Sequence, residues 1–147
     1  MKLTLALVAA LIISANALVA DDAKLIHAIG VVESGMDFRA IGDQGRAVGA
    51  YQMHPEAWQD ANAWRKAQGL PAFPRHAWRD QRVQFHMAQA YMNVLRKRLL
   101  GLGFANPSPG LLAVCWNKGL EGARRDSFRS TRYAKRVVSI EQSPHEK

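Results

Sequence analysis

Glu33 ends an apolar segment of the chain, in the sequence VVES. The apolar residues before it fall at helical spacing, and Glu33 follows Ile29 by four residues and Ile26 by seven, so its carboxyl projects from the apolar face at the last turn. Lost hydration and the negative end of the helix both raise the pKa of such a carboxyl. Glu33 is therefore either an exposed glutamate at a frayed helix end or a group placed for proton chemistry.

A second carboxyl, Asp43, follows ten residues later in the glycine-punctuated stretch GDQGRAVG. This stretch lacks the spacing of a phosphate loop or a dinucleotide fingerprint. It predicts turns or a small hairpin whose backbone can approach an extended ligand closely. An aspartate beside glycine is also an ordinary turn residue, so both interpretations of Asp43 stay open.

Helical periodicity and capping residues predict the elements that position these groups. The first helix runs from Asp21 or Asp22 to Glu33 and stops at Gly35. The further expected helices span 55–68, 77–100, 111–116 and, from Ser130 or Thr131, a last segment that includes Ile140. Trp78 is expected on the core-facing stripe of the long helix, and Gly119 is expected to close the helix of residues 111–116.

The chain begins with Lys2, an apolar stretch and small residues at Ala15 and Ala17, the plan of a secretory signal peptide. We expect residues 1–17 to be this signal, with cleavage after Ala20 as a second choice, and a secreted or periplasmic product. Residues 21–142 then form one domain and 143–147 a frayed tail. No later segment is apolar enough to span a membrane, and the lone Cys115 is expected to be a small buried residue.

The formal net charge of +8 favours anionic partners, such as wall polymers, anionic lipid surfaces or nucleic acid. Nucleic acid is not expected, because no regular row of aromatic residues interleaves the basic ones. The chain's histidines show no paired spacing for metal ligands, so neither a metal nor a cofactor is expected. They are His27, His54, His76, His86 and His145.

Four motifs in order, ESGMDF, GRAVGAYQMHP, CWNKG and RYAKRV, resemble the lysozyme-like superfamily. The match is to soluble lytic transglycosylases, with similarity to invertebrate-type and phage-type lysozymes, over about 100 residues. The resemblance implies an α+β fold, predominantly α-helical, with a small β-hairpin flanking a substrate cleft. It also implies an enzyme that acts on peptidoglycan glycan strands, at the β-1,4 bond between N-acetylmuramic acid and N-acetylglucosamine. A monomer is expected, although nothing in the sequence determines the oligomeric state.

The same resemblance assigns roles to single residues. Glu33 becomes the general acid that protonates the glycosidic oxygen, and Tyr133 the tyrosine whose hydroxyl reaches it. Ser34 follows the acid and bonds locally or to the sugar, Gln52 holds the substrate or the acid, and Asn117 fixes an N-acetyl group. Each of these residues also has a structural interpretation, in capping, turns or core packing.

The chain departs from the family at several points. Two further candidate substrate-binding residues differ from the usual types, since Tyr51 replaces the methionine usual before the glutamine and Trp116 stands where tyrosine is common. The many cysteines of invertebrate-type lysozymes are also missing. Transglycosylases use one carboxyl, whereas hydrolytic lysozymes add a second, so Asp43 decides between them. The expected function is a lytic transglycosylase. The alternatives are a lysozyme using Glu33 and Asp43, an inactive wall-binding module, or a cationic antimicrobial protein.

Overall fold

The computed structural model describes residues 22–144. The expected signal peptide, residues 1–17, lies outside the described residues, as do residues 145–147 of the expected tail. Residues 143–144 are exposed and follow the last helix.

The described chain is predominantly helical and carries a small antiparallel sheet, as the sequence predicted. In the hairpin, Ile41 pairs with Val48 and Gly42 with Ala47. The elements in order are a helix over residues 22–34, β1 (Ile41–Gly42), the 3-10 helix η1 (Asp43–Gly45), β2 (Ala47–Val48), α2 (Pro55–Ala67), the 3-10 helix η2 (Arg75–Arg79), α3 (Gln81–Gly101), α4 (Pro109–Arg125) and α5 (Arg132–Glu141).

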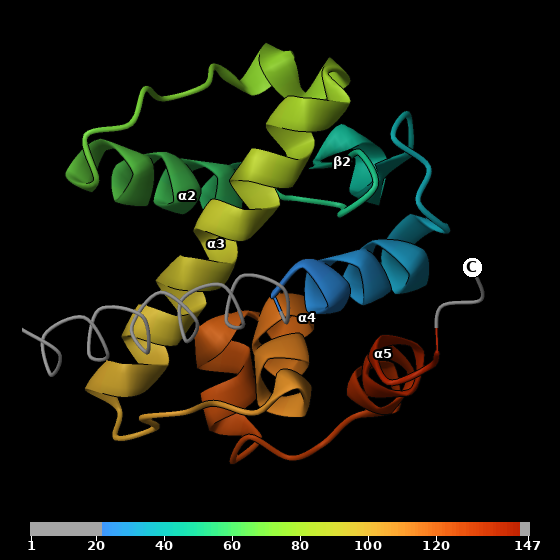
Figure 1. Ribbon diagram of the computed structural model, residues 1–147, viewed down its shortest axis with the longest axis vertical. Helices are drawn as coiled ribbons and strands as arrows, with labels where there is room; N and C mark the ends of the chain where they lie inside the picture. The colour runs from blue at the N-terminus through green and yellow to red at the C-terminus, as the bar shows by residue number, and fades with distance from the viewer. Residues whose placement is uncertain (1–21, 145–147) are drawn as a thin grey trace, which may run out of the picture.

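The long helix α3 runs diagonally through the molecule in Figure 1. It packs against α2 and α4, and α4 packs against α5. The helix of residues 22–34, blue in Figure 1, lies between the hairpin and α5 in that view. The end of this first helix thus contacts α5 and the segment that follows the hairpin.

The core lies where the first helix, α3, α4 and α5 meet. Its largest fully buried side chains are Leu25, Ile26, Ile29, Met87, Met92, Leu95, Leu99, Leu112, Val114, Val137 and Cys115. Burial raises the pKa of the Cys115 thiol to about 11, so this cysteine acts as a packing residue, as the sequence indicated.

The long helix begins later than its periodicity predicted. Asp80 has an extended backbone conformation, and its side chain accepts hydrogen bonds from the backbone N–H groups of Arg82 and Val83. This cap starts α3 at Gln81. Trp78 therefore lies in η2, partly buried against the core, and not on the stripe of the long helix.

The helix around Trp116 is longer than predicted at both ends. Ser108 caps it with a side chain that accepts from the backbone N–H of Leu111 at 3.2 Å, and Pro109 occupies the first turn. Gly119, expected to close the helix, has φ 67° and ψ 162° and only interrupts it. The chain turns sharply there and then resumes the helix to Arg125.

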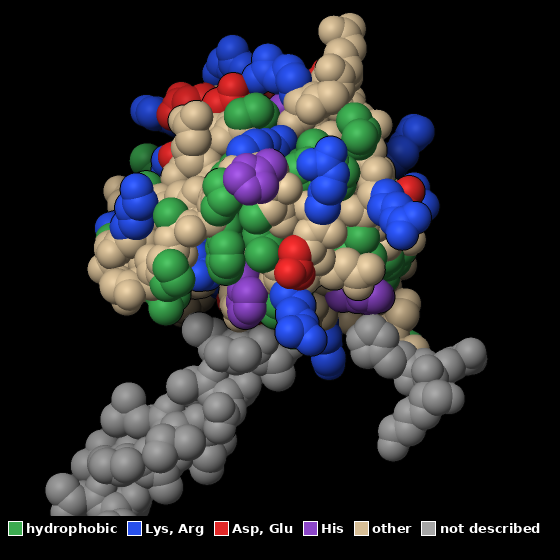
Figure 2. Space-filling model, turned by 90° about the horizontal axis from the view of Figure 1, so that it is seen from above, with side chains coloured by type: hydrophobic (Ala, Val, Ile, Leu, Met, Phe, Trp, Pro, Cys, Tyr) green, Lys and Arg blue, Asp and Glu red, His purple; other side chains and the backbone are tan. Residues whose placement is uncertain are grey.

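Basic side chains are spread over the surface, with acidic ones between them, on the face seen in Figure 2. Several are paired, including Arg46 with Glu56 at 2.7 Å and Arg98 with Asp60 at 2.9 Å.

No helix in the described part of the chain is both long and apolar enough to cross a membrane.

Candidate functional site

Glu33 is half-buried on the last turn of the first helix and accepts a hydrogen bond from the Tyr133 hydroxyl at 2.7 Å. Burial raises the pKa of the Glu33 carboxyl, and the Tyr133 hydrogen bond partly offsets that rise. Burial and the neighbouring carboxylate both raise the pKa of Tyr133, so the phenol keeps its proton and remains a donor. The pair forms a carboxyl that holds its proton to a higher pH than an exposed glutamate does.

The chain turns sharply after Glu33 because two residues adopt left-handed conformations, Gly35 at φ 68° and Met36 at φ 64°. The backbone N–H of Met36 donates to the carbonyl of Gly30 at 3.1 Å, which closes the helix end. Ser34 then fastens this end to the segment after the hairpin, since its hydroxyl donates to the carbonyl of Ala50 at 2.8 Å. The Ser34 hydroxyl also accepts from the backbone N–H of Asp37 at 3.0 Å, which is a local hydrogen bond of the kind that the sequence predicted as one alternative.

Gln84 of α3 holds that segment from the other side. Its side chain is buried, with its carbonyl oxygen accepting from the N–H of Ala50 at 2.8 Å. Its amide nitrogen donates to the carbonyls of Phe38 at 2.8 Å and Trp78 at 2.7 Å. One buried amide thus ties together the loop after the first helix, the turn after β2, and η2. Ala50 is held at both its N–H and its carbonyl.

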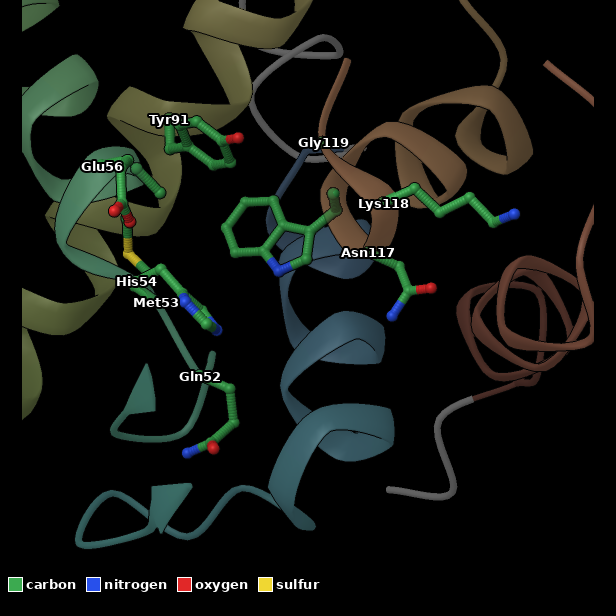
Figure 3. A pocket seen from close by; sticks show the side chains of 10 residues that line it. Gln52, Met53, His54, Glu56, Tyr91, Asn117, Lys118 and Gly119 are labelled. Carbon is green, nitrogen blue, oxygen red and sulfur yellow. The ribbon is translucent and has the colours of Figure 1, made fainter. Parts of the chain in front are cut away.

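Gln52 lies two residues after Ala50, with φ 46°. Its side-chain amide donates to the carbonyl of Gly49 at 2.9 Å, which fixes the side chain at the edge of a pocket. The pocket has a volume of about 270 Å³ and is lined by Gln52, Met53, His54, Glu56, Ala57, Tyr91, Trp116, Asn117, Lys118 and Gly119. Figure 3 shows Gln52 and His54 on the hairpin side of the pocket, and Asn117 and Lys118 on the α4 side.

Two aromatic rings contribute to the apolar part of this pocket. Trp116 is 9 % exposed and meets the ring of Tyr91 edge-on, with 5.2 Å between the ring centroids. The next residue, Asn117, is exposed at the pocket wall. An aromatic floor beside two side-chain amides, Gln52 and Asn117, suits a polar ligand with an apolar face, such as a sugar ring.

Glu33 is not among the residues that line this pocket, but its contacts connect it to both walls. Through Ser34 the helix end is bonded to Ala50, next to the turn that carries Gln52. Through Tyr133 it is bonded to α5, which packs against α4 and hence against the helix of Asn117. The structure thus brings Glu33 and Tyr133 into contact and places Gln52, Trp116 and Asn117 around one pocket.

Asp43 sits in η1 with φ 45° and a side chain 55 % exposed. Its carboxylate faces His54, at 3.6 Å from Nδ1, and Arg46, at 4.0 Å from Nε. Both neighbours come from the hairpin region itself. These contacts are those of a turn aspartate on a basic surface.

Tyr51 does not form a wall of the pocket. It is only 3 % exposed, and its ring lies against the first helix, where a side chain at Gly30 would come within 3.0 Å of the ring. Tyr51, a predicted substrate-binding residue, is not among the residues that line this pocket, and its ring packs into the core.

Within residues 22–144, no three histidine, cysteine or acidic side chains gather where they could hold a metal ion. No family model, curated protein or solved structure matches this chain. The site is therefore interpreted from its own chemistry.

Two residues of the site were not among the predicted site residues. Gln84 bonds to backbone groups that lie 34 and 46 residues away in the chain, and no local pattern reveals such partners. Tyr91 is buried in the core, but the same ring also faces the pocket. An inward-facing polar residue on an apolar stripe, as Gln84 is, was the available hint.

Proposed function

We propose that this chain is a secreted enzyme that cleaves peptidoglycan glycan strands, with Glu33 as the general acid. The observation that carries the proposal is the half-buried Glu33 carboxyl, whose pKa is raised by burial and whose orientation is set by Tyr133. The pocket of Gln52, Trp116 and Asn117 supports it, because amides and an aromatic ring are the groups that bind N-acetylated sugars. The order of the four sequence motifs supports a lysozyme-like fold.

In this mechanism the protonated Glu33 donates its proton to the glycosidic oxygen as the C1–O bond of N-acetylmuramic acid breaks. The leaving sugar departs with that proton, and an oxocarbenium-like sugar remains. The Glu33 carboxylate then accepts the proton of the C6 hydroxyl, and the C6 oxygen bonds to C1. The product carries a 1,6-anhydro ring, and no water is consumed.

The setting of Asp43 favours this reaction over hydrolysis. A second catalytic carboxylate must face the sugar together with the acid, either directly or through a water. The Asp43 carboxylate is exposed and faces Arg46 and His54. We therefore place lytic transglycosylase first and a lysozyme that uses Asp43 second.

The decisive experiment compares purified wild type with Glu33→Gln on isolated cell-wall sacculi, following released fragments by chromatography. Loss of the proton donor should lower the rate at least about 10²-fold. Glu121→Gln, the same change at an exposed position of α4, is the matched control and should keep full activity. A folded Glu33→Gln protein with more than a tenth of the wild-type rate would end the case for Glu33 as the acid.

Mass spectrometry of the same fragments identifies the reaction. A transglycosylase leaves anhydro ends, whereas a hydrolase adds one water and leaves reducing ends. Asp43→Asn should not change the rate or the product if Asp43 is a turn residue. Reducing ends together with a loss of about 10²-fold in Asp43→Asn would establish the lysozyme mechanism instead.

A further inference from the structure

Lys118 lines a second cavity besides the pocket of Asn117. This cavity, of about 450 Å³, lies between the end of α4 and the start of α5, and its lining residues are Lys118, Arg125, Asp126, Ser127, Arg129, Ser130 and Thr131. The break in α4 at Gly119 lies next to Lys118. Figure 3 shows the Lys118 side chain pointing away from the pocket centre, on the far side of Asn117 from Gln52. The two cavities are therefore neighbours that share one lysine.

The second cavity carries surplus positive charge. Among the residues that line this cavity, Asp126 carries the only carboxylate, and that carboxylate is paired with Lys118. The hydrogen bond and charge of Lys118, followed by the charges of Arg125 and Arg129, lower the pKa of Asp126, so these cations gather around one anion. Among the described residues neither arginine forms a salt bridge. Two guanidinium groups remain for an anionic ligand.

The turn that carries these groups is held in place by its backbone. The N–H of Ser127 donates to the carbonyl of Arg124 at 2.9 Å, and the N–H of Phe128 to that of Ala123 at 2.7 Å. The ring of Phe128 packs edge-on against Phe104, with 5.1 Å between centroids. Because the backbone is already ordered, only the arginine side chains must be immobilised when a ligand binds.

We propose that this cavity binds a carboxylate of the peptide branch attached to the glycan, next to the sugar held at Asn117. The inference rests on the proposed function, since a peptidoglycan strand carries acidic peptides on its muramic acid residues. Planar guanidinium groups match the two oxygens of a carboxylate, and the hydroxyl-bearing lining residues can accept or donate to the neighbouring peptide. The shared Lys118 sets the cavity directly beside the sugar pocket, where a branch from a bound sugar would enter it.

Binding of a soluble disaccharide-tetrapeptide, measured by calorimetry on the Glu33→Gln protein, tests the inference without turnover. Replacing Arg125 and Arg129 together with glutamine should weaken binding about fivefold to tenfold, as expected for two partly exposed charged contacts. The matched control replaces Arg132 and Arg136, exposed arginines of α5 outside the cavity, and should leave the affinity unchanged.

A second ligand, the same compound with its carboxylates converted to amides, isolates the charge that is recognised. The amidated ligand should bind the Glu33→Gln protein as weakly as the acidic ligand binds the protein that also lacks Arg125 and Arg129. Replacing the two arginines should not weaken binding of the amidated ligand further. Equal binding of the acidic and amidated ligands would overturn the inference, as would an equal loss in the control variant.

The two proposals fail separately. If the Arg125/Arg129 variant cleaves sacculi normally and the affinity does not depend on the ligand's carboxylates, the peptide site is refuted and the proposed enzyme stands. If binding depends on the ligand's carboxylates but the wild type cleaves no sacculi, the peptide site is supported and the proposed enzyme activity is refuted.

Discussion

Replacing Tyr133 with phenylalanine removes a hydroxyl that lies 2.7 Å from the Glu33 carboxyl, and little else. The hydroxyl donates to the charged form of Glu33 and so holds its pKa below the value that burial alone would give. Without the donor, the protonated form is favoured, and the pKa of Glu33 should rise further. If Glu33 must be protonated to act, the alkaline limb of the activity profile should move to higher pH with it.

The size of the shift follows from the hydrogen bond. A bond to a charged group contributes about 1.5–3 kcal/mol, and one pKa unit corresponds to about 1.4 kcal/mol. Because Glu33 is only half-buried, water can replace part of the lost contact, which leaves an expected upward shift of about one unit. The free energy of unfolding should fall by about 0.5–1.5 kcal/mol, the usual net contribution of one hydrogen bond.

Carbon-13 NMR of the glutamate side chains gives the pKa of Glu33 directly, with its resonance assigned from the spectrum of Glu33→Gln. Tyr51→Phe is the control, since it removes the hydroxyl of another buried tyrosine whose ring lies against Gly30. It should leave the Glu33 titration in place. A Glu33 pKa that falls or does not move in Tyr133→Phe would refute the argument, whatever happens to activity.

The remaining predictions concern stability and the hairpin. Gly49→Ala should lower the free energy of unfolding by more than about 2 kcal/mol, because Gly49 has φ 74° and an added side chain would lie 2.2 Å from the buried Gln84 amide. Denaturant unfolding measures this loss. The control is Gly45→Ala, where φ is 91° but the space is open, so only backbone strain of about 1 kcal/mol is expected. The folded wild type binds the Glu33 proton more tightly than the unfolded chain does, so its stability falls as pH rises from the ordinary glutamate pKa through the raised pKa of the folded state. Glu33→Gln lacks this proton and should therefore gain stability relative to wild type over the same pH range. A difference in unfolding free energy between the two proteins that is the same at acid and neutral pH would contradict this. Asp43→Asn should change the unfolding free energy by less than about 1 kcal/mol, as expected of an exposed turn side chain, and thermal unfolding checks it.

Several helix boundaries were predictable because one residue marks each of them. Pro55 opens α2, Thr131 accepts from the N–H of Ala134 at the start of α5, and Gly35 ends the first helix. The prediction for α3 failed because a cap competes with a continuing apolar pattern, and the predicted end of α4 failed because Gly119 interrupts that helix without ending it. The periodicity of the long helix extends back past Asp80, and only the side-chain bonds of Asp80 show that the helix starts after it.

The candidate site was predictable to the extent that it depends on single residues. Glu33 at the end of an apolar helix face is visible in the sequence because spacing fixes the face. The burial of Tyr51 is not, since the turn after β2 follows neither helical nor strand periodicity. Nor is Gln84, whose bonds to Ala50, Phe38 and Trp78 depend on the tertiary arrangement.

The bond between Glu33 and Tyr133 joins residues 100 positions apart. Closing so long a loop costs conformational entropy that is recovered only when the last helix docks. During synthesis the Glu33 carboxyl is therefore made early and oriented late, because α5 follows all the other described helices in the chain. A nascent or truncated chain that lacks α5 has the carboxyl without its donor, so the Glu33–Tyr133 pair is completed only after the last helix has been made and has docked.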